Sequence, residues 1–188
     1  MVGKFIILIG GYLAAGKTTF SRQLSKELGV LCVNKDYVKE ALCDGLGFNN
    51  RAQNKKMSEA TLDVMLHLAM QSMRVGLPII LESNFRKADG ERIVPLLEQY
   101  DYKPIEVFFE GDLKVLFERF IRRLTNRHPA HTAVDVTWDE YVRHSNELRE
   151  FGIGSERITV DTTSVKNVDY CTIITQIKQL INGGNTNE

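Results

Sequence analysis

The chain has 188 residues, of which 43% are hydrophobic and 26% charged, and its 24 lysines and arginines balance 24 aspartates and glutamates. These values are typical of one globular domain with a sizeable core, and the zero net charge disfavours a general binder of nucleic acid or of membrane surfaces. The three cysteines are too widely spaced for a disulfide framework or a metal-binding pair, and no apolar run is long enough to cross a membrane, so we expect a cytoplasmic protein with buried, inert thiols.

Short apolar runs and helical patterns alternate in the N-terminal half. The isoleucine-rich run at 4–10 is bounded by glycine, which predicts a buried strand, and the helical pattern that starts near Lys17 ends at Gly29. Further along the chain we expect a strand at 30–33, helices at 35–46 and 54–75, and a strand at 78–81.

The same alternation continues to the C-terminus. Five buried strands that alternate with helices predict an α/β protein in which helices cover both faces of a parallel sheet. Ligands bind at the carboxyl ends of such strands, so the residues that follow each strand are the candidates for a site. The remaining expected elements are a helix at 90–100, a strand at 105–109, a helix capped by Asp112 that reaches Leu124, a polar loop at 128–136, a helix from Thr137 or Asp139 to about Phe151, a strand at 158–160 and a helix at 168–181.

The first strand leads directly into Gly11-x-x-x-x-Gly16-Lys17-Thr18, a phosphate loop (P-loop, or Walker A) motif in the strand–turn–helix context that it requires. Its glycines let the backbone wrap around phosphate oxygens, and the N–H groups at the start of the helix point inward. Lys17 would reach the β- and γ-phosphates and the Thr18 hydroxyl would be a ligand of Mg²⁺. We therefore expect ATP to be bound by Gly11, Ala14, Ala15, Gly16, Lys17, Thr18 and Thr19.

Polar residues also follow the second and third strands. Asp36 would lie across the cleft from the phosphate loop, where it could act as a general base on an acceptor hydroxyl or could cap the helix that starts at Tyr37. Glu82 could orient Mg²⁺ through a water molecule or could bind the acceptor. A purely structural polar turn with Ser83 and Asn84 is the alternative for Glu82.

A basic cluster precedes the polar loop. Arg119, Arg123 and Arg127 are spaced four residues apart, so they would share one helix face, and residues 113–131 contain five lysines and arginines against one acidic residue, Glu118. This charge suits an anion, and we expect Arg123 and Arg127 to bind a γ-phosphate and stabilise its transition-state charge. The alternative is a solvated helix face.

Together, the phosphate loop, Asp36 and the Arg123-x-x-x-Arg127 pair resemble the small P-loop kinases, which include shikimate, gluconate and chloramphenicol phosphotransferases and zeta-toxin-like proteins. Over most of residues 4–150 the chain is most similar to the kinase domain of bacteriophage polynucleotide kinase. Glu82 and Lys39 stand where that family has Asp and Arg. The matching stretches are Val33-Asn34-Lys35-Asp36-Tyr37-x-Lys39, Glu82-Ser83-Asn84, similar to its Asp-Thr-Asn, and Arg123-x-x-x-Arg127.

This resemblance implies a P-loop NTPase fold whose five strands lie in the order 2-3-1-4-5. We expect one domain over 1–182 with a disordered tail at 183–188, helices near 37–76 over the acceptor, and a lid at 123–137. Residues 125–137 are predicted to be mobile or open without nucleotide and to close over ATP.

The activity implied is a kinase that uses ATP and Mg²⁺ and transfers the γ-phosphate to a hydroxyl of a small-molecule acceptor. The alternatives are a kinase that acts on polynucleotide 5′-hydroxyls, where nucleic acid is the acceptor, and an ATP-binding switch without phosphotransfer. The expected catalytic residues are Lys17, Asp36, Arg123 and Arg127, and the expected acceptor-binding residues are Asp36, Lys39, Glu82, Ser83, Asn84 and Arg86.

Overall fold

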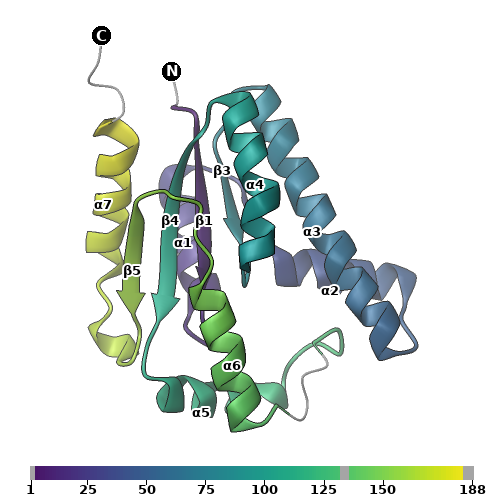
Figure 1. Ribbon diagram of the computed structural model, residues 1–188. Helices are drawn as coiled ribbons and strands as arrows, with labels where there is room; N and C mark the ends of the chain where they lie inside the picture. Colours follow the sequence, from purple (N-terminus) through teal and green to yellow (C-terminus); the bar gives the residue numbers. More distant parts are fainter. Residues whose placement is uncertain (1–2, 132–135, 184–188) are drawn as a thin grey trace.

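In the computed structural model, which describes residues 3–131 and 136–183, five parallel strands form one sheet (Figure 1). The strand order is β2-β3-β1-β4-β5, which confirms the predicted order and the predicted parallel α/β architecture. The predicted tail, apart from Gly183, and residues 132–135 of the predicted lid lie outside the described residues. The strands are β1 (Phe5–Gly11), β2 (Cys32–Asn34), β3 (Ile79–Glu82), β4 (Lys103–Glu110) and β5 (Arg157–Asp161).

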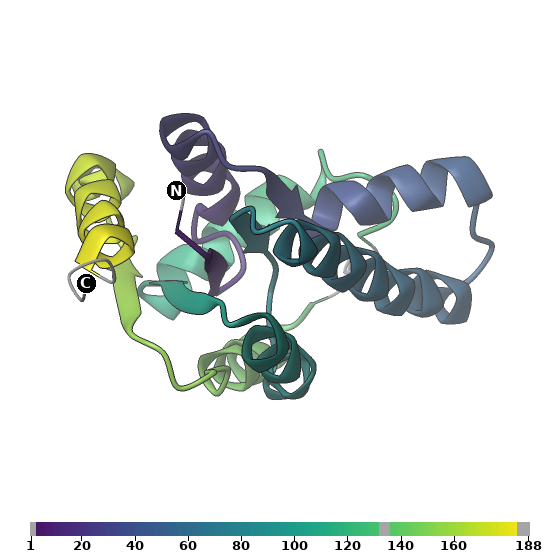
Figure 2. The same cartoon turned by 90° about the horizontal axis from the view of Figure 1, so that it is seen from above.

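Helices cover both faces of this sheet. Figure 2 shows α1 and α7 on one side of the strands and α4 on the other. The long helix α3 packs on the same face as α4, and α5 and α6 lie near the carboxyl ends of the strands (Figure 1). The helices are α1 (Lys17–Leu28), α2 (Lys35–Leu46), α3 (Arg51–Arg74), α4 (Lys87–Tyr100), α5 (Leu113–Leu124), α6 (Trp138–Arg149) and α7 (Tyr170–Asn182), with a 3₁₀ turn at Val165–Asn167.

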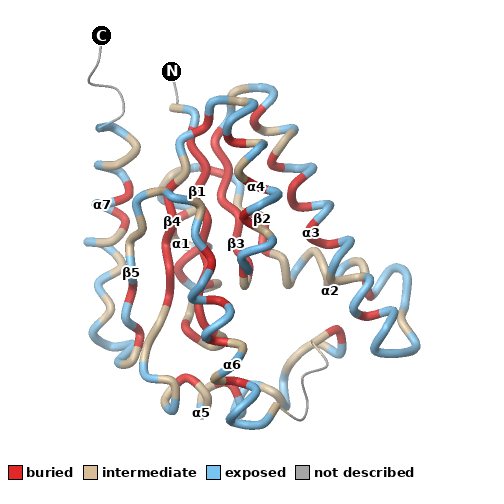
Figure 3. Tube along the Cα trace, in the orientation of Figure 1, coloured by how far each residue is buried: buried red, intermediate tan, exposed pale blue. Residues whose placement is uncertain are grey.

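The central strand β1 is buried on both faces, which explains why its sequence is continuously apolar. Ile7 and Ile9 belong to the core under α1 and α7, whereas Ile6 and Leu8 belong to the core under α3 and α4. Figure 3 shows the buried residues concentrated along the strands and on the helix sides that face them. The rigid centre of the sheet therefore supports the loops at its carboxyl edge.

Two helices begin three residues earlier than the sequence pattern predicts, because polar side chains cap them. Asn50 accepts a hydrogen bond from the Gln53 backbone N–H at 2.9 Å at the start of α3. Asp89 accepts one from the Arg86 backbone N–H at 2.8 Å at the start of α4. The spacing of apolar residues carries no information about such caps.

Among the described residues, no helix combines the length and apolar character needed to cross a membrane.

The thiols only partly match the prediction that all three are buried. Cys43 is buried and Cys32 is intermediate, but Cys171 is exposed near the start of α7. The prediction is wrong for Cys171 because the core side of α7 is made by Ile174 and Ile177.

Gly11, at the end of β1, is required by the close approach of β4. Its φ is +126°, and a Cβ at this position would lie 2.1 Å from the Phe109 carbonyl oxygen. We expect Gly11→Ala to lower the free energy of unfolding by about 3 kcal/mol or more, because overpacking against backbone adds to the strain of a positive φ. Denaturant unfolding measures this change.

Gly45→Ala is the matched control for this substitution. Gly45 lies inside α2, and nothing lies within 4 Å of a Cβ added there. The substitution should stabilise the protein by up to about 1 kcal/mol, because alanine loses less conformational entropy than glycine in a helix. A Gly11→Ala protein as stable as the wild type would contradict the close approach of β1 and β4.

Candidate active site

The loop between β1 and α1 has the backbone shape of a phosphate cradle. Gly16, the residue before α1, is in the left-handed region with φ +89°, and Ala14 is there too with φ +60°. Gly16 supplies no side-chain cap to α1, and the Thr19 N–H donates to the Gly16 carbonyl oxygen at 3.1 Å. The N–H groups of Lys17 and Thr18, in the first turn, have no partner within the helix. Gly11, by contrast, makes room for β4 and does not line the cavity that this loop encloses.

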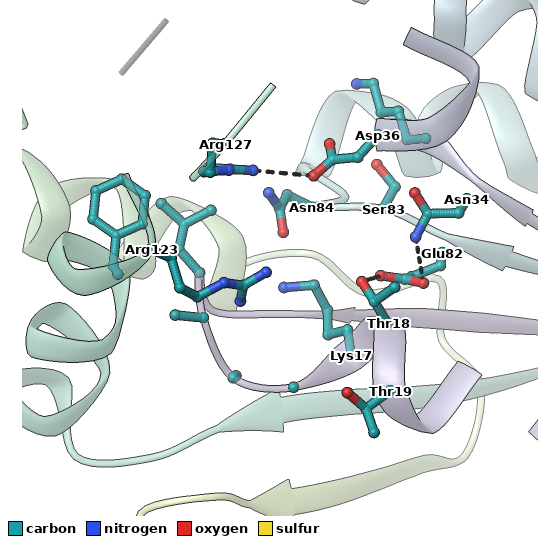
Figure 4. A pocket seen from close by; sticks show the side chains of 16 residues that line it. Lys17, Thr18, Thr19, Asn34, Asp36, Glu82, Ser83, Asn84, Arg123 and Arg127 are labelled. Atoms are coloured by element: carbon teal, nitrogen blue, oxygen red, sulfur yellow. Dashed lines mark hydrogen bonds and ion pairs between the residues drawn. The ribbon is translucent and has the colours of Figure 1, made fainter. Parts of the chain in front are cut away.

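The Lys17 ammonium lies within the loop. Its Nζ donates hydrogen bonds to the carbonyl oxygens of Gly11 at 3.0 Å and Tyr12 at 2.6 Å. Burial lowers the pKa of Lys17 to about 8. Figure 4 shows Lys17 and Arg123 directed into the same space. The arrangement places two cationic side chains in the lining of one cavity.

Glu82, at the end of β3, is buried and fully engaged. Its Oε1 accepts from the Thr18 hydroxyl at 2.7 Å, and its Oε2 accepts from Asn34 Nδ2 at 2.6 Å (Figure 4). The Oε2 atom also accepts from Ser21 Oγ at 2.5 Å. This placement beside Thr18 favours the predicted metal role over the acceptor role. Ser21 is not among the predicted site residues, although it lies about one turn after Thr18 on the same side of α1.

Asp36 lies in the first turn of α2, but it does not cap the helix. The cap is Asn34, whose side chain accepts from the Tyr37 backbone N–H at 3.0 Å, so the capping alternative for Asp36 is wrong. The Asp36 Oδ2 instead accepts from Arg127 at 3.2 Å, and its Oδ1 lies 4.0 Å from His131 Nδ1. The carboxylate is therefore free of any helix-capping role.

The arginines of the basic cluster divide into two groups. Arg123 and Arg127 line the same cavity as Lys17, as predicted for an anion clamp. Arg119 donates at 2.7 Å to the carbonyl oxygens of Thr162 and Thr163 after β5, so it supports the structure elsewhere. The prediction that Arg127 shares one helix face with Arg119 and Arg123 is wrong, because α5 ends at Leu124 and Arg127 lies beyond it.

The segment after Arg127 docks onto α2 and α3. The Ala130 carbonyl accepts from Lys39 Nζ and from Asn54 Nδ2, both at 2.9 Å, and Ala130 is fully buried. His131 Nε2 lies 2.8 Å from Glu40 Oε1, and His128 pairs with Asp44 at 3.0 Å on the same helix. Although 128–136 is predicted to be a polar loop, Ala130 packs into the interior of the protein. Lys39, expected at the acceptor, also holds the lid.

Two cavities meet at Asp36. A cavity of about 150 Å³ is lined by Lys17, Glu82 and the other loop residues, and a cavity of about 610 Å³ lies between α2, α3 and the start of α4. Both are lined by Lys35, Asp36 and Asn84. The smaller cavity brings together Ala14, Ala15, Gly16, Lys17, Thr18, Thr19, Asp36, Glu82, Ser83, Asn84, Arg123 and Arg127, and the larger one adds Lys39 and Arg86.

Tyr141 in α6 is a further residue whose part in this site the sequence did not indicate. Its ring is fully buried against Phe117 and Phe120. Its hydroxyl also donates to the Leu13 carbonyl at 2.9 Å, which ties α6 to the phosphate loop. Only the tertiary fold reveals this contact, because the two residues lie 128 positions apart.

Comparison with known proteins agrees with this geometry. Residues 6–148 match the model of an AAA domain family (AAA_33). A solved structure from Chloroflexus aurantiacus J-10-fl, described as a "putative kinase", is 28% identical with a TM-score of 0.86 and covers 98% of this chain and 100% of its own. No curated protein matches the chain.

Two more distant solved structures share the fold. A gluconokinase from Sinorhizobium meliloti 1021 is 13% identical with a TM-score of 0.57, and the match covers 97% of each chain. A shikimate kinase from Bacteroides thetaiotaomicron is 16% identical with a TM-score of 0.55, covering 95% of this chain and 98% of its own. At such low identity these two likenesses establish the fold alone, which is that of P-loop kinases.

Proposed function

Because the chain belongs to this AAA domain family and has the fold of P-loop kinases, we propose that it transfers the γ-phosphate of ATP to a hydroxyl of a small molecule. The observation that carries the proposal is the meeting of a phosphate-sized cavity and a second, larger cavity at one carboxylate, Asp36. A nucleotide switch needs only the first cavity, whereas a kinase needs a second place for its acceptor.

The residues of the smaller cavity fit a nucleotide with Mg²⁺. The Thr18 hydroxyl and the buried Glu82 carboxylate are hard oxygen donors, which suit this ion. The described residues contain no cluster of three or more His, Cys, Asp or Glu side chains that could hold a metal, so the ion would share its coordination with the phosphates. When bound, Mg²⁺ neutralises charge that develops on the phosphate oxygens.

In the proposed reaction, the acceptor oxygen forms a bond to the γ-phosphorus while the bond to the oxygen that bridges the β- and γ-phosphates breaks. Asp36 takes the proton of the acceptor hydroxyl. Lys17, Arg123 and Arg127 line the cavity where negative charge accumulates on the transferred group. Helices near 37–76 would cover the acceptor, and 123–137 would act as the lid.

A screen for phosphate acceptance tests this proposal. The purified protein is incubated with ATP labelled in its γ-phosphate and with a library of hydroxyl compounds that also includes oligonucleotides with 5′-hydroxyl ends. We expect labelled product from a small molecule and faster ADP formation in its presence. Binding of ATP without transfer to any acceptor would favour the switch, and transfer only to oligonucleotides would favour a polynucleotide kinase.

We expect Arg127→Ala to slow phosphoryl transfer by about 10- to 100-fold, since a charged hydrogen bond to the γ-phosphate is lost. ADP has no γ-phosphate, so its affinity should change much less than the rate. Steady-state kinetics and ADP titration measure the two effects. Arg122→Ala is the matched control, because Arg122 belongs to the same basic cluster but is exposed and paired with Glu118 at 3.8 Å. Normal kinetics for Arg127→Ala would leave Arg127 without a catalytic role.

A further inference from the structure

The larger cavity is lined mainly by residues with polar or charged groups, whose aliphatic stems form a good part of its walls. It is enclosed by α2, α3, the start of α4 and the two histidines His131 and His144. Of its lining residues, all but Leu62 and Ala88 are polar or charged. An acceptor that fills it therefore meets charged and hydrogen-bonding groups together with apolar side-chain stems.

Several charged side chains of this cavity already form ion pairs or hydrogen bonds within the protein. Arg92 and Asp63 form an ion pair at 2.6 Å, and Lys55 and Glu59 lie 3.9 Å apart at the exposed rim. Lys39 donates to Asn54 Oδ1 at 2.8 Å and to the docked lid. The charges of these groups are therefore at least partly compensated within the protein.

Lys35 and Arg86 are the exceptions. Within the part of the chain that the structure describes, neither side-chain cation donates a hydrogen bond or forms an ion pair within 4.0 Å. Burial lowers the pKa of Lys35, Asp89 opposes this shift and the positive charge of Arg86 adds to it. Lys35 is partly buried and Arg86 is exposed at the rim of the cavity, and two neighbouring cations of this kind favour an anion between them.

The junction of the two cavities also offers acceptors to a hydroxyl. Asn84 Oδ1 and Ser83 Oγ are buried and have no hydrogen-bond partner among the described residues. Asn84 lines both cavities, and Figure 4 shows it beside the Asp36–Arg127 pair, with Ser83 next to it. A buried polar atom without a partner is costly, so a donating ligand hydroxyl here would be stabilised.

We propose that the acceptor is a small molecule that carries an anionic group, a carboxylate or a phosphate, held by Lys35 and Arg86 while its hydroxyl lies at Asp36 and Asn84. This inference rests on the proposed kinase function. The cavity volume of about 610 Å³ is that of a small-molecule site, which spans roughly 300–1,000 Å³. A polynucleotide would require a longer basic groove, and the chain has no net positive charge.

The test uses acceptors in matched sets. Glucose, gluconate and glucose 6-phosphate share a hydroxylated chain and differ in charge, and the library is built from further sets of this kind. We expect phosphate transfer to prefer anionic members, with the carboxylate and phosphate arms showing which group is bound. Arg86→Gln and Lys35→Gln should each raise the KM for the best anionic acceptor by about 10- to 100-fold. Arg86→Gln should also leave the KM for ATP unchanged, because Arg86 lines only the larger cavity.

Lys87→Gln is the matched control, because Lys87 is exposed, adjacent to Arg86 and absent from the cavity lining. It should behave like the wild type. A neutral best acceptor, a KM that Arg86→Gln and Lys35→Gln leave unchanged, or transfer only to oligonucleotides would overturn the inference.

If no acceptor is phosphorylated, the proposed function fails, and the anion site is tested separately. Calorimetric titration of the protein saturated with ADP and Mg²⁺ then uses gluconate and inorganic phosphate as probes. Binding that the Arg86→Gln and Lys35→Gln double variant abolishes and Lys87→Gln retains would support the site. Absence of binding, or equal binding by the double variant, would overturn it.

Discussion

Replacing Asp36 with asparagine should slow phosphoryl transfer by about 10²–10⁴ while ATP binding survives, because general-base catalysis is lost and the phosphate cavity is kept. Asparagine has nearly the same size and can still accept a hydrogen bond from Arg127, which lies 3.2 Å from the Asp36 carboxylate. The helix start should not be disturbed, since Asn34 caps α2. Transfer rates and titration with a non-hydrolysable ATP analogue measure the two quantities.

This effect must be separated from a change in the lid, since Asp36 also holds Arg127. The comparison is made in an Arg127→Ala background, where that ion pair no longer exists. If Asp36 is the base, Asp36→Asn causes a similar further loss there. If the double variant is no slower than Arg127→Ala alone, Asp36 acts through the lid and the assignment as a base is wrong.

The strands and helices of the sheet could be predicted from the sequence, because each of them is indicated by a short continuous segment. Apolar runs such as 4–10 between glycines predict buried strands, and their alternation with helices requires parallel crossovers. The strand order followed from the resemblance to P-loop kinases and agrees with the observed order β2-β3-β1-β4-β5. The phosphate loop is likewise a continuous segment, so its motif predicts its position directly.

The hydrogen-bond partners of the site residues could not be predicted from the sequence, because they come from distant parts of the chain. Ser21 and Asn34 hold Glu82 from separations of 61 and 48 residues. Lys39 is expected to bind the acceptor on the basis of the resemblance to P-loop kinases. In the structure, it donates a hydrogen bond to the carbonyl oxygen of Ala130, 91 residues away. Spacing within one helix predicts faces but not contacts, and it cannot tell that α5 ends before Arg127.

Lys17→Ala should reduce phosphoryl transfer by about 10²–10³, since the cation that serves the β- and γ-phosphates is removed from a buried site. The affinity for an ATP analogue should fall as well. Lys26→Ala is the matched control, because Lys26 is exposed in the last turn of the same helix. Circular dichroism verifies that both variants are folded.

The pH dependence of nucleotide binding gives this prediction a second measurement. Burial lowers the pKa of Lys17 to about 8, Glu82 and Asp36 oppose the shift, and Arg123 and Arg127 add to it. Phosphate favours protonated Lys17, so binding takes up a proton where the free protein has lost it. As the pH rises above about 8, affinity should fall by up to about tenfold per unit until the pKa of the complex is reached. A terminal phosphate ionises near pH 6, so it contributes little there.

Calorimetry at pH 7, 8 and 9 should show this fall in nucleotide affinity for the wild type and Lys26→Ala but not for Lys17→Ala. If Lys17→Ala keeps normal affinity and rate, or the wild type binds equally well at all three values, Lys17 does not bind the phosphates.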